Sequence, residues 1–151
     1  MKNKPDALRA YPVHFAKQVE WGDMDAMQHV NNVRYFYYAE SARLQLLAEI
    51  FPAFADGSLA QSGEAFTLAE TSCRYKTSLT WPDQIEIGSV VESVDDTSFI
   101  VKHAIYSAKF DCIAAELHAR LVRYDYVQRC RSQITPDERT VLEKYRLRES
   151  R

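Results

Sequence analysis

The densest group of polar side chains in the chain lies in the stretch 21–32. It contains two carboxylates, Asp23 and Asp25, together with His29 and two asparagines. A carboxylate that is partly shielded from water has a raised pKa and becomes a better general base near neutral pH. The same residue types also form turns and helix caps, so their presence alone leaves a purely structural role open.

A long apolar helix is predicted directly after this stretch, over residues 33–50. Its helical wheel has one narrow polar stripe, which holds Arg34, Ser41, Gln45 and Glu49. So narrow a stripe predicts a helix that is largely buried. Asn31 or Asn32 would be the N-cap. A helix N-terminus offers unpaired N–H groups and a favourable dipole, so it can hold a developing oxyanion close to the carboxylates.

Apolar alternation predicts five strands around this helix. The first covers 13–21, and its apolar face would include Trp21. The others are predicted at 66–79, 84–94, 98–107 and 112–124. Turn-forming residues separate these four strands. Connections this short indicate antiparallel pairing, because a parallel crossover needs a dozen or more residues.

The C-terminal part of the chain predicts a second, short helix. Thr135 would be its N-cap, Pro136 its first residue, and Glu138 would complete a capping box. The predicted fold is therefore α+β: a curved five-stranded antiparallel sheet wrapped around one long buried helix, with a short C-terminal helix. A length of 151 residues suits a single domain over 1–151.

Composition excludes several classes of function. A net charge of −2 argues against nucleic-acid binding, which normally requires a basic excess. No apolar run approaches the roughly 20 residues of a membrane span, and the polar N-terminus lacks a signal-peptide core, so a cytoplasmic location is expected. The three cysteines, at positions 73, 112 and 130, have no CxxC spacing, which suits a reducing compartment. No phosphate-binding glycine motif is present.

The loop and the start of the helix resemble the acyl-CoA thioesterases of the hotdog superfamily, in particular the 4-hydroxybenzoyl-CoA thioesterase type and its long-chain acyl-CoA thioesterase relatives. The residues that carry the resemblance are Asp23-Met24-Asp25, then His29-Val30-Asn31-Asn32-Val33-Arg34-Tyr35, then Glu40-Ser41-Ala42-Arg43. The likeness extends over about 12–125 and is specific across 21–43. It implies a hotdog fold and hydrolysis of a thioester to a free acid and the CoA thiol.

The resemblance also implies roles for individual residues. Asp25, four residues before His29, matches the catalytic carboxylate, which either activates a water molecule or attacks the thioester carbonyl itself. The backbone N–H of Asn32, next to Asn31 at the helix start, matches the oxyanion donor. His29 would order the loop or approach the substrate. Asp23 is expected to be structural.

The sequence departs from the family where some members hold the CoA phosphates with basic residues. The corresponding turn, 94–98, is acidic here. Arg74 and Lys76 are the predicted alternative grip on CoA, unless an acyl-carrier protein delivers the acyl group. Glu40 and Arg43 lie beside the apolar arc of the helix, three residues apart, and are expected to form an internal or subunit-interface ion pair.

The family further implies a homodimer or homotetramer with the acyl pocket between subunits, and an open sheet edge would favour such pairing. No metal or redox cofactor is expected. Asp23, Asp25 and His29 have a spacing that would suit a metal, but no second ligand cluster follows them. The alternative function is a non-enzymatic acyl-CoA sensor on the same fold. Acyl length and aromatic or aliphatic preference are not determined by the sequence.

Overall fold

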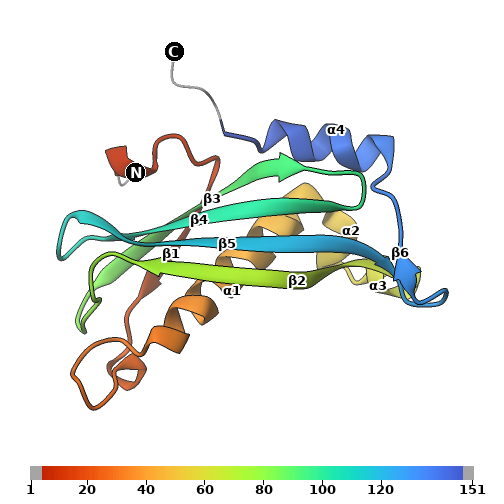
Figure 1. The fold of residues 1–151 in the computed structure, drawn as a ribbon. Helices are drawn as coiled ribbons and strands as arrows, with labels where there is room; N and C mark the ends of the chain where they lie inside the picture. Colours follow the sequence, from red (N-terminus) through yellow and green to blue (C-terminus); the bar gives the residue numbers. More distant parts are fainter. Residues whose placement is uncertain (1–4, 148–151) are drawn as a thin grey trace.

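One antiparallel sheet frames the protein in the computed structural model, which describes residues 5–147 (Figure 1). Its strand order is β1-β3-β4-β5-β2, and every neighbouring pair is antiparallel. The strands are β1 (Val13–Gln18), β2 (Glu64–Tyr75), β3 (Gln84–Val94), β4 (Ser98–Ser107) and β5 (Cys112–Asp125), with a two-residue β6 (Cys130–Arg131) paired to β5. The predicted curved antiparallel sheet is confirmed.

The long helix α1 (Asn32–Ile50) crosses one face of the sheet (Figure 1). Asn31 is its N-cap, because its side chain accepts a hydrogen bond from the Val33 N–H at 3.0 Å. Two further one-turn helices, α2 (Pro52–Ala55) and α3 (Ser58–Gln61), lead from α1 to β2. The buried side of α1 packs on inward-facing strand residues in two core clusters, one around Tyr38 and Ile87 and one around Leu46 and Phe99.

Only the inner side of α1 is covered. Three apolar residues on its outer side, Val33, Tyr37 and Leu44, are 53%, 56% and 43% exposed. The inner side of α1 is buried as predicted, and its exposed side carries apolar residues as well as the polar stripe. The physical reason is geometric: a single sheet curls around one side of a helix and leaves the other side open.

Local irregularities give the sheet its curl. The register shifts between Leu68 and Glu70, between Val91 and Ser93, and between Ile105 and Tyr106. Each such bulge bends its strand and increases the local twist. The helix α4 (Pro136–Lys144) packs against β3 and begins with the predicted Thr135–Glu138 capping box.

The first strand is shorter than predicted. β1 ends at Gln18, and the Val19 N–H donates to the carbonyl of Asp83 at 2.9 Å, outside the ladder. A short 3₁₀ turn, η2 (Trp21–Asp23), follows. Glu20 and Asp23 form a capping box, in which the side chain of each accepts a hydrogen bond from the backbone N–H of the other. Trp21 is therefore 70% exposed instead of lying on the apolar face of a strand.

The second strand also differs from the expectation. β2 ends at Tyr75, because the N–H groups of Lys76 and Thr77 both donate to the Ala114 carbonyl. Although the connection to β3 is short, β2 and β3 do not pair; β2 lies at the far edge, beside β5. The connection has eight residues, 76–83, which span up to about 26 Å when extended. The distance from β2 to β3 across the sheet is three strand spacings, about 14 Å. The connection can therefore cross the end of the sheet instead of turning back.

Candidate active site

The loop before α1 is a tight antiparallel hairpin that carries Asp25. The Asp25 N–H donates to the His29 carbonyl at 2.9 Å, and the Asn31 N–H donates to the Asp23 carbonyl at 2.9 Å. At the tip, the Gln28 N–H donates to the Asp25 carbonyl at 3.0 Å, and Gln28 has a φ of 62°. The hairpin thereby brings the carboxylate back beside the start of the helix.

The Asp25 side chain is half-buried, and only one of its two oxygens is engaged. Oδ1 accepts a hydrogen bond from the Met27 N–H at 2.9 Å, in an Asx turn. Among residues 5–147, no group of the chain donates to Oδ2. One oxygen thus fixes the orientation of the carboxylate, and the other is available to take a proton or to attack a carbonyl carbon.

Asn31 caps the first turn of α1 and accepts hydrogen bonds from two of its N–H groups. The Val33 N–H donates to the Asn31 side chain at 3.0 Å, and the Arg34 N–H donates to the Asn31 carbonyl at 2.8 Å. Within the part of the chain that the structure describes, the Asn32 N–H has no acceptor. Asn31 therefore caps the helix and leaves the Asn32 N–H, at the positive end of the helix dipole, for an oxyanion.

Asp23 holds the hairpin onto the helix. It is only 5% exposed, and its Oδ2 accepts hydrogen bonds from the Tyr38 hydroxyl at 2.5 Å and the Glu20 N–H at 3.0 Å. Its other oxygen lies 3.7 Å from the Arg34 guanidinium. Burial and the hydrogen bond to Asp23 raise the pKa of Tyr38, so this tyrosine is a neutral donor. These contacts support the structural role expected for Asp23.

Residues distant in sequence hold the hairpin from the other side. The Val30 N–H donates to the Leu79 carbonyl, and the Leu79 N–H donates to the Tyr35 hydroxyl, both at 2.9 Å. The Tyr75 hydroxyl donates to the Asn32 carbonyl at 2.9 Å, and its ring meets the Tyr35 ring edge-on at 4.9 Å. The crossing connection between β2 and β3 thus anchors the helix start, a role with no local sequence signal.

A hollow of about 510 Å³ opens beside the carboxylate of Asp25. It is lined by Trp21, Gly22, Met24, Asp25, Gln28 and Trp81. Sequence reasoning missed the two tryptophans as site residues: it places Trp21 on the apolar face of the first strand and gives Trp81 no role. A large aromatic residue in a turn, where no strand can bury it, is the signal that could have drawn attention to Trp81.

The other predicted site residues fall in two places. The His29 side chain is exposed on the hairpin, and its backbone carbonyl orders the loop by accepting from Asp25. Arg74 and Lys76 flank Tyr75, which faces α1, and alternation therefore turns Arg74 towards the opposite face of the sheet. Lys76 pairs there with Glu116 at 3.0 Å. The structure does not bring Arg74 and Lys76 together with Asp25 within one chain.

The predicted pair on the helix is present but uneven. The Arg43 side chain is 9% exposed, whereas that of Glu40 is 56% exposed, and their charged atoms are 3.9 Å apart. Burial lowers the pKa of Arg43, and the charge of Glu40 partly opposes this shift. Arg43 is thus buried inside the protein, whereas its partner Glu40 lies at the surface.

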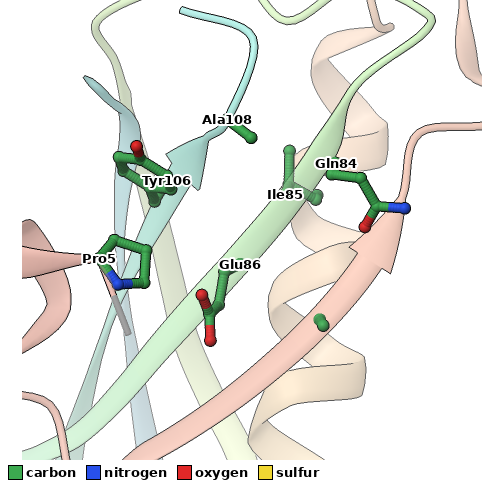
Figure 2. Close-up of a pocket in the computed structure, with 7 residues that line it drawn as sticks. Pro5, Gln84, Ile85, Glu86, Tyr106 and Ala108 are labelled. Atoms are coloured by element: carbon green, nitrogen blue, oxygen red, sulfur yellow. The ribbon is translucent and has the colours of Figure 1, made fainter. Parts of the chain in front are cut away.

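A second hollow, of about 410 Å³, lies on the sheet beside the start of β3 (Figure 2). Its acidic residue, Glu86, is already engaged, since its carboxylate lies 3.1 Å from Nδ1 of His14. The residues lining this hollow are Pro5, Ala16, Gln84, Ile85, Glu86, Tyr106 and Ala108. None of the predicted site residues is among them.

Two other features bear on the class of protein. Among residues 5–147 no three His, Cys, Asp or Glu side chains gather as metal ligands would, so Asp23, Asp25 and His29 do not form such a cluster. In the same described range, no helix has the length and apolar character needed to cross a membrane. The expectation that no cofactor is required stays a prediction.

The model of the Thioesterase-like superfamily matches residues 19–144, which include the hairpin, α1, strands β2 to β6 and α4. The chain belongs to this superfamily. The family predicted from the sequence is thereby confirmed, and with it the general class of enzyme, a thioester hydrolase. No curated protein sequence matches the chain significantly.

Solved structures of thioesterases share the fold of this superfamily member. A gentisyl-coenzyme A thioesterase is similar with a TM-score of 0.73 and 23% identity, over 85% of this chain and 98% of the other. A DHNA-CoA thioesterase from Staphylococcus aureus has a TM-score of 0.76 and 18% identity, over 87% and 89%. A 1,4-dihydroxy-2-naphthoyl-CoA thioesterase from Synechocystis has a TM-score of 0.75 and 14% identity, over 86% of this chain and 94% of the other. These likenesses confirm the hotdog fold.

Proposed function

We propose that this protein is an acyl-CoA thioesterase in which Asp25 is the catalytic carboxylate and the Asn32 N–H is the oxyanion donor. The observation that carries the proposal is the pairing of two unused groups at one junction. Within residues 5–147, one carboxylate oxygen of Asp25 accepts no hydrogen bond, and the Asn32 N–H in the first turn of the neighbouring helix has no acceptor. Asp25 lies on a hairpin that hydrogen bonds with α1 and with the crossing connection hold beside the start of the helix.

Thioester hydrolysis needs little more than these two groups. As a general base, Asp25 takes a proton from a water molecule while the water oxygen attacks the carbonyl carbon. The carbonyl oxygen becomes negative, and the Asn32 N–H stabilises it. The C–S bond then breaks, and the CoA thiolate takes a proton. A thiol has a pKa near 8.5, so the thiolate leaves without a strong acid.

The nucleophilic route uses the same geometry. Asp25 Oδ2 would attack the carbonyl carbon, expel the thiolate and form an acyl anhydride, which water then hydrolyses. A single turnover in ¹⁸O-labelled water separates the routes. On the general-base route the label enters the product acid and none enters Asp25, whereas on the nucleophilic route attack on the aspartyl carbonyl transfers label to Asp25.

The test of the proposed function is release of free thiol from a panel of acyl-CoAs. Turnover that is lost in Asp25→Asn would support a thioesterase. Saturable binding of acyl-CoA without thiol release would instead support the acyl-CoA sensor.

The carrier is tested by comparing the CoA ester with the same acyl group on an acyl-carrier protein or on pantetheine alone. Arg74→Glu and Lys76→Glu should raise KM for the CoA ester but leave KM for the pantetheine ester unchanged, because only CoA has phosphates. Equal effects on both esters would remove these residues from the CoA site.

A further inference from the structure

The hollow beside Asp25 has walls of exposed aromatic surface. Trp21 and Trp81 both line it, and they are 70% and 45% exposed. They come from distant parts of the chain. Met24 links these two parts, because its Sδ accepts a hydrogen bond from the backbone N–H of Trp81 at 3.4 Å. Indole rings usually bury most of their surface, so two exposed ones at a single hollow indicate a binding surface.

Both tryptophans of the chain lie at this one hollow. Its volume of about 510 Å³ is within the usual range for small-molecule sites, roughly 300–1,000 Å³. Gly22 also leaves it open, since an added Cβ would meet no atom of the chain within 4 Å. A side chain at position 22 therefore has room, and the backbone conformation there is one that residues other than glycine can adopt.

The chemistry of the walls indicates which part of the substrate fits. Only two groups adjoin the thioester carbonyl at Asp25: the acyl group and the pantetheine arm. Pantetheine carries amides that need both donors and acceptors, whereas apart from Asp25 the side-chain groups of the hollow that form hydrogen bonds are the Gln28 amide and the indole N–H groups, which only donate. Two indoles and a thioether offer flat, polarisable surface, which favours a planar ring.

We propose that Trp21 and Trp81 form the acyl-binding walls and select a planar aromatic acyl group. This proposal rests on the proposed thioesterase function, because it takes Asp25 as the position of the thioester. Stacking on each indole strengthens binding of a ring over an aliphatic chain of similar size by roughly threefold to tenfold, the equivalent of about 0.5–1.5 kcal/mol.

Tryptophan fluorescence tests the proposal directly, since every tryptophan signal comes from this hollow. The probes are S-benzyl-CoA, S-hexyl-CoA and free CoA, thioethers and a thiol that cannot be hydrolysed. We expect a saturable change in emission with S-benzyl-CoA at concentrations where free CoA gives none. S-hexyl-CoA should bind more weakly. Gly22→Val should fold normally and weaken the binding of S-benzyl-CoA, because Gly22 lines the hollow and the added side chain takes up part of its space.

Kinetics supply the second readout. Trp21→Leu and Trp81→Leu should each lower kcat/KM for benzoyl-CoA by roughly threefold to tenfold and change the value for hexanoyl-CoA less. Tyr126→Leu is the matched control: Tyr126 is 53% exposed and follows β5, at the end of the sheet opposite the hairpin (Figure 1). It should alter neither value.

Three outcomes would overturn the proposal and leave the thioesterase function intact. Free CoA might reproduce the emission change, which would assign the hollow to pantetheine. Emission could depend on protein concentration and not on ligand, in which case a second copy covers the indoles. Finally, the tryptophan variants could hydrolyse benzoyl-CoA and hexanoyl-CoA at wild-type rates. Failure of the wild-type protein to hydrolyse any acyl-CoA would instead overturn the proposed function itself.

Discussion

Replacing Asp25 with asparagine would remove the charge of the carboxylate and change little else. The Oδ1 of asparagine can still accept the Met27 N–H, which donates to Asp25 Oδ1 at 2.9 Å, so the Asx turn is retained. The side chain is half-buried in a surface loop. We therefore expect the free energy of unfolding to change by no more than about 0.5 kcal/mol, as for ordinary surface substitutions.

The effect on catalysis should be much larger. An amide can neither take the proton of a water molecule nor attack a carbonyl carbon, so kcat should fall by about 10²- to 10⁴-fold. The lower bound is about 2.7 kcal/mol of lost transition-state stabilisation, at about 1.36 kcal/mol for each factor of ten. Substrate binding should change less, because the charge acts chiefly as the transition state forms.

Asp23→Asn is the matched control, since it makes the same chemical change two residues away. Asp23 is buried, and an asparagine oxygen in place of Oδ2 can still accept from Tyr38 and Glu20, but these bonds lose the charge of the acceptor and the amide NH2 would face the Arg34 guanidinium. A cost of about 1–3 kcal/mol follows. At about 2–4 °C per kcal/mol for a domain of this size, Tm should fall by about 2–12 °C. On folded protein, kcat should change far less than in Asp25→Asn.

The assay is thiol release from one acyl-CoA at saturating concentration, below the Tm of every variant. Circular dichroism would verify that each protein is folded. The reasoning is refuted if Asp25→Asn retains more than a tenth of the wild-type kcat. Folded but inactive Asp23→Asn, beside an active Asp25→Asn, would exchange the roles assigned to the two carboxylates.

Three other predictions concern assembly, cofactors and pH. We expect a homodimer or larger oligomer joined through an open sheet edge, because β2 pairs on one side only; light scattering should give at least twice the 17.4 kDa chain mass, and an active monomer would contradict this. A chelator should leave thiol release unchanged; loss that zinc or magnesium restores would show a metal requirement. Burial, with the charges of Arg43 and His118, lowers the pKa of His103 to about 3. Between pH 6.5 and 3 the unfolded chain therefore binds a proton that the folded chain does not, so stability should fall by up to about 1.4 kcal/mol per pH unit as the pH drops. His103→Gln should make urea-unfolding free energies less dependent on pH in this window; an unchanged slope would assign the acid sensitivity elsewhere.

Local pattern was sufficient to predict most of the elements. Alternation placed β3 and β4 at their observed bounds, and the helix predicted over 33–50 differs from α1 by one residue. The capping box at Thr135 was likewise readable, because its two hydrogen bonds join residues three apart. Such features depend on contacts and burial periods within a few residues, which a single sequence displays directly.

The core of the candidate site was also accessible from the sequence. Asp25 and the start of α1 are joined by one short hairpin, so their proximity follows from chain connectivity. The resemblance to the thioesterases points to the Asn32 N–H as the oxyanion donor, but the sequence pattern leaves open whether Asn31 or Asn32 is the N-cap, and the structure gives this position to Asn31. Pattern alone does not separate two adjacent asparagines, since both have the same preference for that position.

Tertiary structure decided the rest. The connection after β2 crosses the end of the sheet, places Leu79 against Val30 and Tyr35, and brings Trp81 to the hollow beside Asp25. The burial of Asp23 under Tyr38 depends on how the hairpin packs on α1. Local propensity for the segment after Tyr75 is the same whether it turns back or crosses over. The choice is made by which long-range arrangement buries more apolar surface and pairs more backbone groups, and that comparison exists only in the folded chain.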